Sequence, residues 1–272
     1  MINQLQYRAY YATRGYEMHE IDADQKEHPL YSPQNKFIVP IMGIHKDKQG
    51  ETHKSYVRDL QVLPNNIYAK FLEILNPVYD AGISEELLHK VLDWKDKEFR
   101  EDLWTLVEKE CLKFANNYGC DSIADVDQME WGDGFDVDEG ESIFAEPERF
   151  WNPPTVLGMI NEAIELRNHV INDWKYQPSI TKRLNTAYPL RIKVVSKFKD
   201  ITVGLTDQVW GSIWWSWFYS DLSYWPKPCE WCGAPILHDA RASFCQPPRQ
   251  CKNRFHNFKA KEKKEQSKNA DK

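Results

Sequence analysis

The sequence lacks several of the features from which a protein's function is most directly inferred. No stretch reaches the ~18 consecutive apolar residues that a membrane-spanning helix needs. The opening residues, MINQLQYRAY, do not combine a basic segment with an apolar run, as a signal peptide does. A glycine-rich phosphate loop, a serine nucleophile elbow and a histidine-rich cluster are also absent. We therefore expect a cytoplasmic protein with no membrane segment, and we lean against an enzyme.

What the sequence does have is a large apolar and aromatic content and an uneven charge. The chain has 272 residues, of which 42% are hydrophobic and 13% aromatic, enough to bury a large core. Its net charge is −6, yet residues 249–272 hold nine basic and three acidic residues, a local charge of +6. The other 248 residues therefore sum to −12. A basic C-terminal segment follows an acidic body.

Hydrophobic periodicity predicts an α+β fold with a mainly helical domain over residues 1–225. Pro40 favours an edge or irregular position for the strongest early strand candidate. The expected elements are a strand at 36–44, helices at 99–118 and 155–176, a hairpin of strands 190–196 and 200–205, and a tryptophan-rich helix at 207–222.

The tryptophan-rich segment allows two interpretations. Trp210, Trp214 and Trp217 recur at helical spacing, which is typical of a helix buried in the core. The same rings could instead form a wall for a ligand or for stacked bases. We favour the core helix, and Trp225 and Trp231 on either side of the following proline break could pack the next segment onto it.

An acidic stretch spans residues 121–148, with eleven Asp or Glu and no Lys or Arg. Asp136 and Asp138 begin like a calcium-binding loop, but Gly140 comes one place early and no Glu occupies the twelfth position. We interpret the stretch as a solvated loop. It could also attract a basic partner protein or the chain's own basic tail.

The cysteines carry the clearest chemical signal. Cys111 falls on the apolar face of a predicted helix and is expected in the core, whereas four of the six cysteines crowd into 23 residues. Two residues separate the first two of these four and a glycine follows the second, twelve residues separate the middle two, and five separate the last two. This spacing predicts a knuckle, a hairpin and a helix, the treble-clef arrangement, over residues 226–260. The expected ligands are Cys229, Cys232, Cys245 and Cys251.

Four thiolates close a tetrahedral site, so one structural Zn²⁺ is expected, with no position open to substrate. His238 and His256 are alternative ligands, which the four-cysteine arrangement leaves unused. Residues 261–272 are expected to form a basic flexible tail.

One part of this segment is similar to a known family. Cys251-Lys252-Asn253-Arg254, preceded by Phe244-Cys245 and followed by basic residues, resembles the C-terminal zinc finger of CGNR-type bacterial proteins over about thirty residues. Lys252 stands where that family has glycine. The resemblance implies zinc ligation by the four cysteines and a role in transcription regulation through DNA.

Three functions follow from these features. The first is a nucleic-acid-binding regulator, in which cations near the last cysteine contact phosphates of DNA or RNA and Asn253 or Arg254 reaches a base edge. The second is a protein-interaction or autoregulatory module, with residues 121–148 as the partner surface. The third is an HNH-like nuclease using His238, Asn253 and His256. The candidate nucleic-acid contacts are Arg249, Lys252, Asn253, Arg254, Lys259, Lys261, Lys263 and Lys264.

Overall fold

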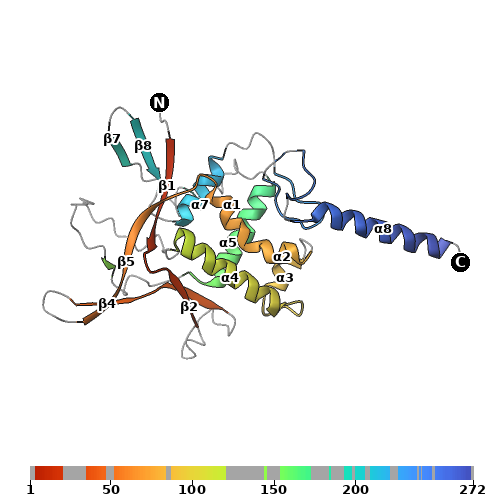
Figure 1. Ribbon diagram of the computed structural model, residues 1–272, viewed down its shortest axis with the longest axis horizontal. Coiled ribbons are helices and arrows are strands. Elements are labelled where there is room, and N and C mark those ends of the chain that lie inside the picture. Colours follow the sequence, from red (N-terminus) through yellow and green to blue (C-terminus); the bar gives the residue numbers. More distant parts are fainter. Residues whose placement is uncertain are drawn as a thin grey trace.

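The computed structural model describes the chain in segments, shown in Figure 1. The described residues are 4–20, 35–46, 52–83, 87–120, 144–145, 154–172, 184, 193–197, 200–205, 209–220, 226–237, 239, 241–246 and 249–270. In Figure 1 the strands lie on one side, a group of helices lies in the middle, and the C-terminal helix projects from the opposite side. The α+β class is confirmed.

Most of the strands belong to one six-stranded sheet with the order β4-β5-β1-β8-β7, and β6 also pairs with β5. β1 runs antiparallel to β5 and parallel to β8, while β7 and β8 form the predicted antiparallel hairpin. Tyr7 and Ala9 of β1 are buried and point to the same face, as the period of two in a strand requires. The strands are β1 Gln4–Ala12, β4 Gly43–Lys46, β5 Thr52–Leu63, β6 Phe144–Ala145, β7 Lys193–Lys197 and β8 Asp200–Leu205.

This sheet is larger than the sequence analysis anticipated, since β1 and β5 were not predicted. The expected strand at residues 36–44 is in fact two strands. β3 (Lys36–Pro40) pairs with β2 (Tyr16–Glu20) in a separate two-stranded sheet, whereas β4 pairs with β5. The break follows Pro40, whose ring nitrogen cannot donate a ladder hydrogen bond.

The middle of the molecule is helical. α4 agrees with the predicted helix: Glu101 and Asp102 occupy its first turn, and Gly119 ends it at φ 89°. Cys111 lies fully buried on its inner face, as predicted. The helices are α1 Ile67–Leu72, a 3₁₀ turn at Glu73–Leu75, α2 Asn76–Asp80, α3 Leu88–Val91, α4 Glu101–Tyr118, α5 Val156–Asn172, α7 Val209–Phe218 and α8 Cys251–Ala270.

The tryptophan-rich helix α7 is a core helix, which confirms the favoured interpretation. Trp210, Trp214 and Trp217 are fully buried, and the Trp210 ring meets Phe71 of α1 edge to face at 5.2 Å. Ser216 of α7 accepts a hydrogen bond from the Tyr68 amide at 3.1 Å, which fixes α1 against α7. These rings therefore build the core rather than a ligand wall.

Some predictions concern residues outside the described ranges. The acidic stretch 121–148 is described only at Phe144–Ala145, which form β6, and Trp225 and His238 are also outside. Across the helices that are described, none combines the length and the apolar character needed to cross a membrane.

Candidate metal centre

The first cysteine pair lies on a tight knuckle. The Gly233 amide donates to the Cys229 carbonyl at 2.9 Å, and Gly233 adopts φ 73°, a conformation that favours glycine. The Cys229 amide in turn donates to the Ala234 carbonyl at 2.8 Å. This turn places the thiols of Cys229 and Cys232 on one side of the backbone.

The second pair approaches from two further segments. The Glu230 amide donates to the Ser243 carbonyl at 3.0 Å, which ties the segment ending near Cys245 to the knuckle. Cys251 is the first residue of α8. Three of the four cysteines are buried, and Cys245 is partly exposed.

The four sulfur atoms fit a metal ion. All four Sγ atoms lie within 4.8 Å of one another, with Cys232 and Cys245 at 3.5 Å and Cys232 and Cys251 at 3.7 Å. A disulfide needs an S–S distance of about 2.05 Å, and all of these cysteines are free. In a tetrahedral site with metal–sulfur bonds of about 2.3 Å, the sulfur atoms are about 3.8 Å apart. The four predicted ligands are therefore positioned to bind a metal ion.

The thiols cannot all ionise easily without a cation. Hydrogen bonds from the Cys232 and Cys245 thiols hold the pKa of Cys229 far below its ordinary value. The hydrogen bond to Cys229 raises the pKa of Cys232. Burial, and then the charges of Cys245 and Cys229, raise the pKa of Cys251 to about 11. A bound cation would supply the charge that lets all four become thiolates.

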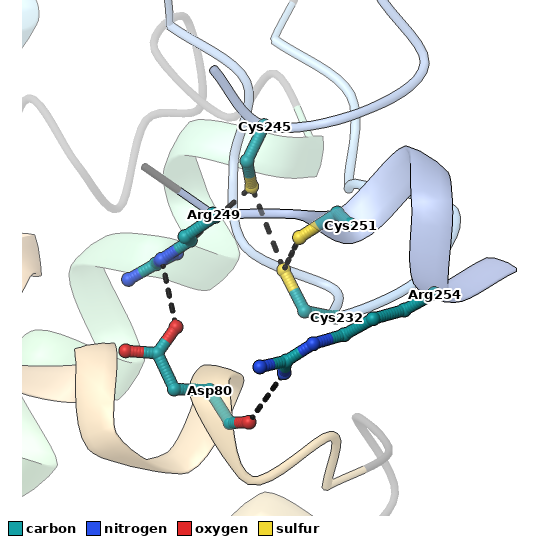
Figure 2. Close-up of polar contacts among 6 residues, drawn as sticks. All are labelled: Asp80, Cys232, Cys245, Arg249, Cys251 and Arg254. Carbon is teal, nitrogen blue, oxygen red and sulfur yellow. Dashed lines mark hydrogen bonds and ion pairs between the residues drawn. The ribbon is translucent and has the colours of Figure 1, made fainter. Parts of the chain in front are cut away.

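Two arginines join this cluster to the helical body, as Figure 2 shows. Arg249 Nη1 lies 3.9 Å from Cys245 Sγ, and Arg249 Nε lies 3.0 Å from Asp80 Oδ1 at the end of α2. Arg254 Nη1 donates to the Asp80 carbonyl oxygen at 3.0 Å. Burial alone would lower the pKa of Arg249, but the charges of Asp80 and the nearby cysteines raise it. Both arginines, predicted as nucleic-acid contacts, thus have partners within the chain.

A third arginine, on α5, forms a hydrogen bond to the backbone of the knuckle. Arg167 of α5 is only 1% exposed, and its Nη2 donates to the Gly233 carbonyl at 2.8 Å. Arg167 was not predicted as part of the site, although a single arginine within the apolar stripe of a predicted helix was a usable signal. Asp80, the partner of Arg249 and Arg254, was not predicted either, because no local pattern distinguishes it.

The remaining predicted contacts lie along α8, which Figure 1 shows leading away from the rest of the molecule. Lys259 forms an exposed ion pair with Glu262 at 2.9 Å. The helix continues to Ala270, through residues for which a flexible tail was expected. The exposed residues are Lys252, Asn253, Lys259, Lys261, Lys263 and Lys264.

His256, one of the alternative ligands, does not belong to a second metal-binding group in the described part of the chain. The His256 ring lies 6.2 Å from that of Phe244 and 5.8 Å from that of Phe255, and His256 is exposed on α8. Among the residues the structure describes, the group of His, Cys, Asp or Glu able to hold a metal is the four cysteines.

Comparisons with protein-family models, with curated proteins and with solved structures give no match to this chain. The resemblance to CGNR-type zinc fingers therefore stays a prediction.

Proposed function

We propose that the four cysteines bind one structural zinc ion, and that this site fixes the base of α8, which the protein uses to bind nucleic acid. One observation carries the proposal: Cys251 is both a member of the sulfur cluster and the first residue of a 20-residue basic helix. A metal bound there would hold the helix in one direction relative to the body.

Zinc is the ion that best suits these ligands. Four thiolates in a closed tetrahedron form a typical structural zinc site, and reduced thiols suit a reducing compartment such as the cytoplasm. The knuckle at Gly233, the return through Cys245 and the helix beginning at Cys251 support a treble-clef arrangement. A segment this short buries little apolar surface, so metal binding would provide much of its folding free energy.

The charges of α8 support phosphate binding. Between Cys251 and Ala270 there are seven Lys or Arg and two Glu, a net charge of +5. Lys252, His256, Lys259 and Lys263 are spaced by four, three and four residues, so they share one face of the helix, and all four are exposed. Glu262 borders that face and pairs with Lys259 at 2.9 Å. A cationic strip of this kind suits a phosphate backbone.

The proposed role is that of a regulator, in line with the resemblance to CGNR-type proteins. The helical body would position α8 on the nucleic acid. The contacts of Arg249 and Arg254 with Asp80 would couple the orientation of α8 to the body. In this proposal Arg249 and Arg254 orient α8, and the exposed lysines contact phosphates.

The test is the salt dependence of binding. We would measure the affinity of the zinc-loaded full chain for mixed-sequence DNA, as a duplex and as a single strand, by fluorescence anisotropy over a range of salt. Affinity falls with salt, and each lost phosphate contact makes the slope of log affinity against log salt less steep, by about 0.9 on a duplex and about 0.7 on a single strand. Removing three contacts should therefore make it less steep by ~2–3. The test variant replaces three lysines of α8 with Gln: Lys252, Lys259 and Lys263.

A matched control removes the same charge from the body. Its three replaced lysines are exposed and lie outside α8: Lys90, Lys97 and Lys109. The control should keep the wild-type slope. Equal slopes for wild type and the α8 variant, or no retention of DNA or RNA at low salt, would refute a nucleic-acid function. In that case we would infer that α8 binds a protein partner.

A further inference from the structure

A group of aromatic rings surrounds the base of α8. Phe258 of α8 lies 5.9 Å from Trp231 of the cysteine knuckle, measured between ring centroids. One turn earlier, Phe255 lies 5.3 Å from Phe244, which precedes Cys245. His256 packs beside Phe244 and Phe255. We call Trp231, Phe244, Phe255, His256 and Phe258 the aromatic platform.

The platform is open to solvent, unlike the aromatic core of the body. Phe258 is 47% exposed, His256 is exposed, and the other three rings are partly exposed. In α7, by contrast, Trp210, Trp214 and Trp217 are fully buried. The chain thus has an enclosed aromatic core, and the rings beside the cysteine cluster remain accessible to a ligand with a flat apolar face.

The platform adjoins the cationic face of α8. The Lys259 ammonium lies 6.0 Å from the Phe255 ring centroid and 5.9 Å from that of Phe258. Lys259 also belongs to the face that carries Lys252 and Lys263. Its ion pair with Glu262 is exposed, so a phosphate can compete for the ammonium. Rings and cations therefore lie side by side at the base of one helix.

We infer that the aromatic platform stacks unpaired bases, so that the target of α8 is a single strand rather than a duplex; this inference rests on the proposed function. Bases inside a duplex stack on each other and do not offer their faces to a protein. Bases of a single strand do, and aromatic rings beside basic side chains bind them with little regard to sequence. Phe258 is the ring best placed to receive a base, because it is the most exposed of the three phenylalanines.

The test separates base stacking from phosphate binding. We would measure the affinity of the zinc-loaded full chain for three ligands of about 15 nucleotides: oligothymidylate, an abasic strand of equal length, and a duplex. The abasic strand keeps the phosphates and lacks the bases. We expect oligothymidylate to bind about tenfold more tightly than either the abasic strand or the duplex.

Variants then assign this preference to Phe258. Phe258→Leu keeps an apolar side chain but removes the ring, and should weaken oligothymidylate binding about tenfold while leaving abasic binding unchanged. Phe258→Trp restores a ring and should restore the preference. Leu106→Ala, at a residue 46% exposed on α4, is the matched control and should change neither affinity.

The outcomes distinguish the two proposals. Equal binding of oligothymidylate and abasic strand, with no effect of Phe258→Leu, would overturn base stacking and leave phosphate binding by α8 intact. An equal loss for both strands in Phe258→Leu would show that the ring serves only to position the helix, and would also overturn stacking. Failure of the wild type to bind any of the three ligands would remove the proposed function itself.

Discussion

The contact between Arg249 and Asp80 allows the connection between the cysteine cluster and the helical body to be tested quantitatively. The guanidinium lies 3.0 Å from the carboxylate, 5.5 Å from the Tyr79 ring centroid and 3.9 Å from Cys245 Sγ. The Arg249 side chain is 18% exposed and that of Asp80 is 56% exposed. Removing either charge should loosen the cluster from α2.

The magnitude follows from distance and exposure. Two unit charges about 4 Å apart attract by roughly 4 kcal/mol at an effective dielectric constant of about 20. Solvent around Asp80 screens most of this attraction, and exposed pairs contribute ~0–1 kcal/mol. We therefore expect Asp80→Asn to lower the free energy of local opening at the knuckle by about 1 kcal/mol. Arg249→Met also removes the contact with Cys245 and should cost about 2 kcal/mol.

The assay is a double-mutant cycle on the zinc-loaded protein. Hydrogen exchange of the knuckle amides, including the Gly233 amide that donates to Cys229, gives the free energy of local opening. The double variant of Arg249 and Asp80 should lose about 1 kcal/mol less than the sum of the single variants. Arg254 serves as an internal check, because its bond to the Asp80 carbonyl survives Asp80→Asn.

If the losses in the free energy of local opening add to within about 0.3 kcal/mol, Arg249 and Asp80 are not energetically coupled. Asp80 and Arg249 would then be neighbours without an energetic link, and Arg249 would again be available as a nucleic-acid contact.

Two further predictions concern the body. An alanine at Gly15, where φ is 84°, would place its Cβ 2.3 Å from Asn116 Oδ1, so Gly15→Ala should cost ~2–3 kcal/mol in thermal unfolding. Gly82→Ala has a similar φ of 71° with nothing within 4 Å and should cost ~1 kcal/mol, and the reverse order would contradict the structure. Burial raises the pKa of Tyr79 above its ordinary value, so the unfolded state releases this proton first. The free energy of unfolding should therefore fall as the pH rises above about 10. Chemical denaturation should show a smaller fall for Tyr79→Phe. The same fall in Tyr79→Phe and in the wild type would argue against burial of the Tyr79 hydroxyl.

Much of the candidate site was predictable because its information is local. The short spacings around Cys229 and Cys251, with Gly233 after the first pair, are sufficient to predict a four-sulfur cluster. The amphipathic stripe of α4 and its stop at Gly119 are likewise local signals, and the structure confirms both.

The rest depends on contacts between distant residues. The Arg254–Asp80 hydrogen bond joins residues 174 positions apart, and the sequence around either residue does not indicate the other as its partner. The strands β1 and β5 were not predicted because their sequences (QLQYRAYYA and THKSYVRDLQVL) mix polar and apolar residues without an unbroken apolar run. Their pairing, from Tyr7 with Leu63 to Ala12 with Arg58, makes them strands. The length of α8 was missed for a similar reason, because a helix rich in lysine has no apolar stripe to mark it.

Metal analysis of the purified full-length chain tests the central claim most directly. We predict one zinc per chain, and hydrogen-exchange protection of the knuckle amides that is lost on chelation and weakened in Cys251→Ser. A wild-type protein that contains no metal, yet keeps these amides protected, would contradict it.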